Sequence, residues 1–254
     1  MLCRTAGLSE PEGFGPTRAV SEDELASARA ALIEKGVLDD AGESGLHPSL
    51  AANLAIWAMP AVIVRVDVWM RDRGLRAAYA VQGQLGASLF TLADDGVELS
   101  MFAAADLGFE LRRCVPERPT DAGGRSTMSR LVPDTGSARL HGRLPLAVLT
   151  DGAVPGFNPD GRRVTEAEAA LADEVRGRTV GVLQCLAVGV PPGDTSSAVA
   201  GNVVWFATDA GWVGVSPHPD GTGRRLVDLV PVGPEAIGGW LAPHLARILE
   251  VTNA

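Results

Sequence analysis

The clearest pattern in the sequence is a strict alternation of side-chain types over residues 62–69. Four valines occupy one side of this segment, and the other side holds Ile63, Arg65, Asp67 and Trp69. A period of two predicts a strand whose two faces meet different surroundings. Further short apolar runs, separated by turns rich in glycine and charged residues, predict an antiparallel meander. Its other strands are expected at residues 75–81, 87–92 and 97–101.

Two helices are predicted ahead of this meander. Ser21 and Glu24 have the spacing of a capping box, in which each side chain bonds the backbone N–H of the other residue. The helix that follows has an apolar stripe and is expected to stop at Gly36. A second helix is expected from Pro48 to near Met59. We expect the two helices to pack as an N-terminal hairpin, through a stripe made of Leu25, Ala28, Leu32 and Ile33.

The second half of the chain repeats the order of the first. A helix is predicted over residues 102–115, after the first meander, and a segment rich in proline and glycine follows it. A strand within 140–150 and a loop over 151–163 come next, and Thr165 then opens a second capping box. The remaining expected elements are a helix to about 176, strands at 179–188, 202–208, 212–216 and 225–232, and a helix over 234–250.

This order predicts an α+β fold with a quasi-twofold internal repeat and antiparallel sheets. Whether the two sheets join or pack about a pseudo-twofold axis is left open by the sequence. The expected organisation is a flexible N-terminus, a first α+β repeat, a linker and a second α+β repeat, together forming one compact domain. The corresponding residues are 1–20, 21–116, 117–139 and 140–254.

Composition narrows the classes of function. The 254 residues carry a formal net charge of −9, which disfavours binding to nucleic acid or anionic lipid. The longest stretch without strongly polar residues, 54–64, is too short to span a membrane and contains Pro60. The first 20 residues do not have the apolar core of a signal peptide, so we expect a cytoplasmic protein. Three widely separated cysteines predict neither a disulfide framework nor a zinc site.

No catalytic motif stands out. The four histidines are not spaced with one another, with cysteines or with acids as metal ligands on one helix would be, and no phosphate-binding or nucleophile motif is present. The sequence therefore predicts a protein that is not an enzyme and uses no cofactor. The alternative is an enzyme with a cleft between the two halves, in which His141, His218 or Cys185 would be the reactive group.

Two tryptophans are candidates for contact with another protein. Trp69 shares a strand face with Arg65, and Trp212 lies on the opposite side of its strand from two valines. Because tryptophan is enriched at the centres of protein interfaces, Arg65, Trp69 and Trp212 are the candidate partner-binding residues. The loop over residues 190–201 is a candidate adjustable rim. The alternative is that a helix or linker of this same chain covers each tryptophan.

Three segments give the chain a family resemblance that extends over most of its length. They read LASARAALIEKGVL, HPSLAANLAIWAMPAVIVRVDVWMRDRGLRAAYAV, and GWVGVSP followed by RRLVDLVPVGPEAIGGWLAPHLARIL. In these segments the chain resembles the EspG family, cytosolic chaperones of the type VII (ESX) secretion system of actinobacteria. The resemblance implies a central sheet flanked by helical bundles and a non-enzymatic role.

The same resemblance implies a partner. Such chaperones bind a PPE protein of a PE–PPE heterodimer, cover the apolar tip of its helical hairpin and help deliver it to the secretion machine. A WXG100-like helical hairpin is the other client that we consider. The family gives no interface residue that maps position by position onto this sequence. A third possibility, a structural protein that forms a homodimer through an exposed sheet, also stays open.

Overall fold

A computed structural model gives the fold of the chain. It describes residues 20–38, 47–71, 74–91, 96–117, 140–150, 164–189, 199–219 and 225–252. All eight segments contribute helices or strands, apart from short turns and caps. The predicted α+β class is confirmed, because the described residues combine helices with one large antiparallel sheet.

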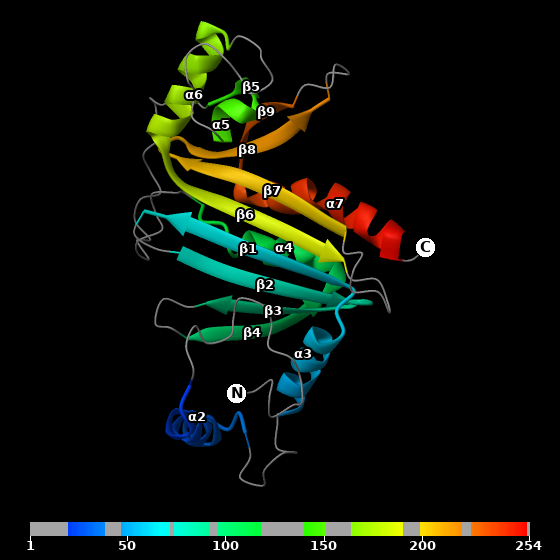
Figure 1. The fold of residues 1–254 in the computed structure, drawn as a ribbon. Coiled ribbons are helices and arrows are strands. Elements are labelled where there is room, and N and C mark those ends of the chain that lie inside the picture. The colour runs from blue at the N-terminus through cyan, green and yellow to red at the C-terminus, as the bar shows by residue number, and fades with distance from the viewer. Residues whose placement is uncertain are drawn as a thin grey trace, which may run out of the picture.

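The sheet has nine strands in the order β4-β3-β2-β1-β6-β7-β8-β9-β5 (Figure 1). The strands of the first half and those of the second half therefore join into a single sheet, through antiparallel pairing of β1 with β6. The strands are β1 (Val62–Met70), β2 (Gly74–Gln82), β3 (Leu85–Thr91), β4 (Val97–Ala103), β5 (Gly142–Pro145), β6 (Thr179–Gly189), β7 (Val199–Thr208), β8 (Gly211–His218) and β9 (Leu226–Val232).

The order of elements is the same on both sides of the β1–β6 pair. On one side the chain runs β1, β2, β3, β4, then the 3-10 turn η1 (Ala104–Asp106) and helix α4 (Leu107–Arg112). On the other side it runs β6, β7, β8, β9, then η2 (Pro234–Ala236) and helix α7 (Ile237–Thr252). The short strand β5 lies outside this scheme, at the edge next to β9.

Helices α4 and α7 cover one face of the sheet, which we call the helix-covered face. The four valines of β1 that share a side are all buried there, as the alternation predicts. Leu111 of α4 and Leu241 of α7 are fully buried against them. The two helices approach closely at a pair of glycines: a Cβ on Gly238 would lie 2.9 Å from the Cα of Gly108.

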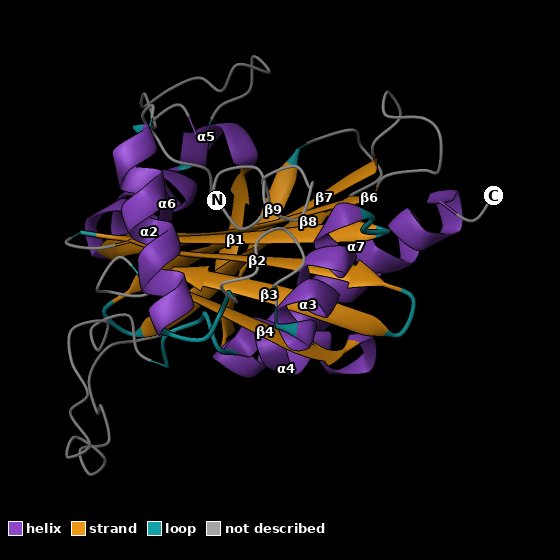
Figure 2. Cartoon of the chain, turned by 90° about the horizontal axis from the view of Figure 1, so that it is seen from below, coloured by secondary structure: helices purple, strands orange, loops and turns teal. Residues whose placement is uncertain are grey.

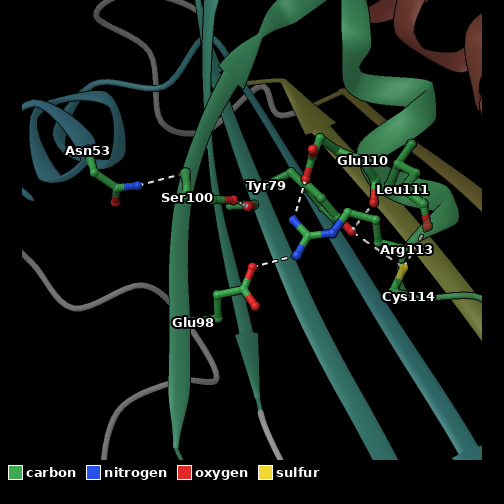
Figure 3. A network of polar contacts seen from close by, with 9 residues as sticks. Asn53, Tyr79, Glu98, Ser100, Glu110, Leu111, Arg113 and Cys114 are labelled. Carbon is green, nitrogen blue, oxygen red and sulfur yellow. Dashed lines mark hydrogen bonds and ion pairs between the residues drawn. The ribbon is translucent and has the colours of Figure 1, made fainter. Parts of the chain in front are cut away.

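A polar network fixes α4 on the helix-covered face (Figure 3). The hydroxyl of Tyr79, on β2, donates to the carbonyl of Glu110 at 3.0 Å and contacts the Cys114 thiol. Arg113 forms ion pairs with Glu98 of β4 and Glu110 of α4. Burial raises the pKa of the Tyr79 phenol, so this side chain acts as a neutral hydrogen-bond donor.

On the opposite face of the sheet, the described helices lie only toward the two ends. Helix α3 (Pro48–Ala58) packs through Ile56 on Ala80 and Ala87, near the β4 edge. Helices α5 (Leu146–Thr150) and α6 (Glu166–Arg178) cover β8, β9 and β5 at the other end. Figure 2 shows α3 separated from α5 and α6 along the sheet. We call the part of this face between them, over β1, β2 and β6, the open face.

The predicted helical hairpin at the N-terminus is wrong. Helix α2 (Glu22–Glu34) has the expected capping box, and Gly36 follows it with a φ of 67°, but none of its residues is buried. Figures 1 and 2 both show α2 lying apart from α3. Helix α3 instead packs on the sheet, where Ile56 contacts Ala80 and Ala87.

Two other expected elements differ from the structure. The predicted helix over residues 102–115 is shorter, because Phe102 extends β4 and is buried in the core before α4 begins. The predicted strand at 140–150 divides into β5 and α5. The loop expected at 151–163 and nearly all of the linker at 117–139 lie outside the described residues. Every helix in the described part of the chain falls short of the length and apolarity needed to span a lipid bilayer.

Candidate docking surface

The open face carries the side of β1 that the alternation predicts to be partly polar. Arg65, Asp67 and Trp69 alternate with the buried valines and so point to this face. The register sets Arg76 of β2 directly beside Asp67 on one side, and Gln184 of β6 on the other. Three neighbouring strands therefore bring these side chains together at the centre of the sheet.

Asp67 is held between two arginines. The Nε of Arg65 donates to Oδ2 of Asp67 at 2.6 Å, and its Nη2 donates to Oδ1 at 3.3 Å. The Nε of Arg76 donates to the same Oδ1 at 2.9 Å. Both carboxylate oxygens are thus occupied by charge-assisted hydrogen bonds, which offset the cost of burying this charge.

The arginines are more accessible than the acid that holds them. The side chain of Asp67 is only 10% exposed, whereas those of Arg65 and Arg76 are 34% and 39% exposed. A group approaching from solvent therefore meets the guanidinium groups and not the carboxylate. We call Arg65, Asp67 and Arg76 the arginine cluster.

An apolar surface adjoins the arginine cluster. Trp69 is 45% exposed, and the register sets it between Gly74 of β2 and Val182 of β6. Leu186 of β6, which pairs with Arg65, is partly exposed on the same face. Because Gly74 has no side chain, it leaves one flank of Trp69 uncovered by β2. The open face thus combines an aromatic side chain, aliphatic side chains and cationic groups.

Trp212 is not available to a partner. It lies opposite Val213 and Val215, as the strand phasing indicates, but that side of β8 belongs to the helix-covered face. Only 2% of Trp212 is exposed, its Nε1 donates to the carbonyl of Pro116 at 2.8 Å, and its ring packs near Trp205. The alternative considered from the sequence holds here, since this same chain covers the tryptophan.

The three reactive groups considered for an enzyme lie far apart in the sheet. Cys185 is fully buried in the central strand β6, where burial raises the pKa of its thiol. His218 pairs with Leu226 of β9, which also pairs with Pro145 of β5. His141 lies at the other end of β5, just before Gly142. In the described parts of the chain, no three His, Cys, Asp or Glu side chains are grouped to hold a metal ion.

His218 instead takes part in an ion-pair cluster at the edge of the sheet. Its Nδ1 lies 2.8 Å from Oδ2 of Asp228, and Nε of Arg143 donates to Oδ1 of Asp228 at 2.8 Å. The hydrogen bond from Arg143 is the main reason that the pKa of Asp228 lies below its ordinary value. All three side chains come from neighbouring strands, β8, β9 and β5, so the cluster ties the edge strand to the sheet.

Sequence reasoning identified Arg65 and Trp69 on this surface but missed Arg76. The sequence signal for Arg76 is the hairpin that joins β1 to β2. Trp69 pairs with Gly74, so two residues further from the turn Asp67 pairs with Arg76. Within the proposed rim, residues 190–198 lie outside the described part of the chain, and 199–201 belong to β7.

A comparison with models of protein families identifies the family of this chain. The model of the EspG family matches residues 4–242, which is nearly the whole chain. The chain belongs to the EspG family. This confirms the resemblance of the three quoted segments, and it covers both halves of the sheet together with α4 and the first part of α7.

EspG-family proteins are chaperones associated with ESX (type VII) secretion, and the family is not one of enzymes. A search of the curated proteins found no match to this chain. The family membership therefore gives the general role, which is association with ESX substrates.

Proposed function

We propose that this EspG-family protein is a non-enzymatic cytosolic chaperone that binds a helical-hairpin secretion substrate and directs it to an ESX system. The client is a PPE-like protein, or a WXG100-like hairpin where PPE proteins are lacking. Such a client exposes an apolar tip and would aggregate in water unless another protein covered it. The chaperone would bind that tip on the open face, through Arg65 and Trp69.

The observation that supports this proposal most strongly is the large exposed fraction of Trp69, on a sheet face where the helices of the described segments lie toward the ends. Tryptophan combines a large apolar area with a hydrogen-bonding N–H, and exposed tryptophans on a partly apolar face are frequent anchors of protein interfaces. Main-chain groups of β1 are paired on both sides, so a client would contact side chains and would not add a strand.

We also propose that the fold is a quasi-twofold internal repeat. The identical order of strands and helices on the two sides of the β1–β6 pair supports it, and so does the close approach of Gly108 and Gly238 at corresponding positions of α4 and α7. The boundaries 21–116 and 140–254 remain our proposal for the two repeats, as do flanking helical bundles.

Co-expression tests the proposed function. The tagged chain would be produced with each PE–PPE pair and each WXG100-like pair from its own genome, and the products separated by size exclusion with light scattering. We expect one client class to form a complex of fixed stoichiometry, while the chain alone shows its own mass and reveals any homodimer. If no hairpin client forms a complex, the proposed function is wrong.

A further inference from the structure

We propose that Arg65 and Arg76, held over the buried carboxylate of Asp67, form a binding site for a carboxylate side chain of the client. The site would recognise an Asp or Glu that lies next to apolar side chains on a client helix. This inference rests on the proposed function, because it names the chemistry by which the same surface selects its client.

Charge is the first argument. Among the strand residues that the register places on this side of the sheet, the charged ones are Arg65, Asp67 and Arg76. Two arginines and one aspartate make this group of strand residues basic in composition, in a chain whose net charge is −9. Arginine side chains suit a single carboxylate, whereas the strongly negative chain as a whole would repel a polyanion.

Geometry is the second argument. Asp67 fixes both guanidinium groups by their Nε atoms, so neither arginine has to be ordered when a partner binds. The Nη1 of Arg65 takes no part in the contacts with Asp67. Preorganised guanidinium groups on a sheet favour carboxylates, because planar N–H donors match the two oxygens.

The apolar neighbours are the third argument. Trp69 lies two residues from Asp67 along β1, and Leu186 of the neighbouring strand β6 pairs with Arg65. A client that places an acid on the arginine cluster would therefore set adjoining side chains against a tryptophan and a leucine. Covering these groups excludes water, which strengthens the ion pair. An acid within an apolar helix face fits this arrangement better than an acidic tail.

A double-mutant cycle with the captured client tests the inference. Each exposed acid of the client's hairpin tip would be changed to its amide, and each variant titrated against wild-type chain, Arg65→Gln and Arg76→Gln. We expect one client acid to be coupled to the arginines. Arg65→Gln or Arg76→Gln alone should weaken binding about tenfold, and combining either with the amide at that client position should cause little further loss. Arg143→Gln is the matched control, since Arg143 also pairs with an aspartate across strands and lies on another part of the molecule.

Some outcomes would overturn the inference while leaving the chaperone role intact. One is a stable complex in which no client acid is coupled to Arg65 or Arg76. Another is a change in the mass of the isolated chain on Arg65→Gln, because a second copy would then occupy the site. Circular dichroism on each variant separates these results from unfolding, and Arg65→Lys, which keeps the charge over Asp67, should bind more tightly than Arg65→Gln.

A small-molecule probe decides the question if no client is found. In spectra of the chain with labelled arginine Nε, glutarate should cause saturable shifts of the Arg65 and Arg76 signals, and its neutral analogue glutaramide should not. Arg176, an exposed arginine on α6, serves as the internal control. Saturable shifts would support the carboxylate site even though the proposed function had failed. Equal shifts at every exposed arginine, or none, would overturn the site.

Discussion

At the scale of single residues, two tryptophans on neighbouring parts of one sheet have opposite surroundings. Trp69 is 45% exposed and Trp212 only 2% exposed, although both sit on strands with valines on the other side. The difference comes from the faces that they occupy: Trp212 belongs to the core cluster that contains residues of α4 and α7, whereas Trp69 points to the opposite face of the sheet. Trp212 is therefore a packing residue, and Trp69 is the one of the two that we propose as a binding residue.

This contrast predicts two distinct phenotypes. Trp69→Ala should weaken client binding by about 2 kcal/mol, as expected for an interface anchor, with little change in the free energy of unfolding. Trp212→Ala should lower the free energy of unfolding by about 3–5 kcal/mol, because it opens a cavity in the core. Urea denaturation and titration with the client measure the two effects. Equal loss of stability in both variants would contradict the assignment.

The buried cysteines give a second residue-scale prediction. Burial raises the pKa of Cys114 to about 12 and raises that of Cys185 as well, so neither thiol ionises near neutral pH. In a Cys3→Ser background, both should react with a maleimide at pH 8 only when urea unfolds the chain. Rapid modification of the native protein would contradict the buried, structural role of these residues.

The ion-pair cluster at the sheet edge predicts a pH dependence. Arg143 and His218 lower the pKa of Asp228 from its ordinary value of 3.8, so the stability that the carboxylate adds is present above that value and is lost as pH falls below it. Asp228→Asn should consequently lose less stability than wild type between pH 7 and pH 3, measured by urea midpoints. If both proteins lose the same stability between pH 7 and pH 3, the Asp228 carboxylate adds no stability to the fold.

At the scale of elements, the crossing of α4 and α7 depends on glycine. Gly238 faces Gly108, whereas a Cβ on the next residue, Gly239, would meet nothing within 4 Å. Alanine improves helix propensity equally at both positions. Because Gly238→Ala also forces the two helices apart, it should be less stable than Gly239→Ala by roughly 1–3 kcal/mol. Thermal unfolding of the two variants checks this, and equal midpoints would argue against the close crossing.

The elements that could be predicted from the sequence are those that depend on residues close together in the chain. Both capping boxes and the two faces of β1 follow from neighbouring residues, so these predictions are confirmed. The pairing of β1 with β6 has no local signal, because it joins strands from opposite halves of the chain. Strand phasing likewise gives the side on which Trp212 lies but not the helix that covers it.

At the scale of the whole molecule, one sheet serves two purposes. Its helix-covered face holds the main core, with α4 and α7 packed against the central strands. Its other face is occupied by α3 and by α5 with α6 toward the ends, which leaves the arginine cluster and Trp69 between them. Figure 1 shows β1, β2 and β6 running uncovered by helices between α3 and α6. The proposed client surface thus lies on inner strands of the sheet.

The most direct test of this account is site-specific photo-crosslinking within the captured complex. A photoreactive phenylalanine would replace Gln184, which the register sets beside Asp67 on the open face, and in a second variant Phe109, which is 67% exposed on α4 at the helix-covered side. The account predicts crosslinks to the client from position 184 and none from position 109. Crosslinks from 109 with none from 184 would place the client on the other side of the sheet and contradict it.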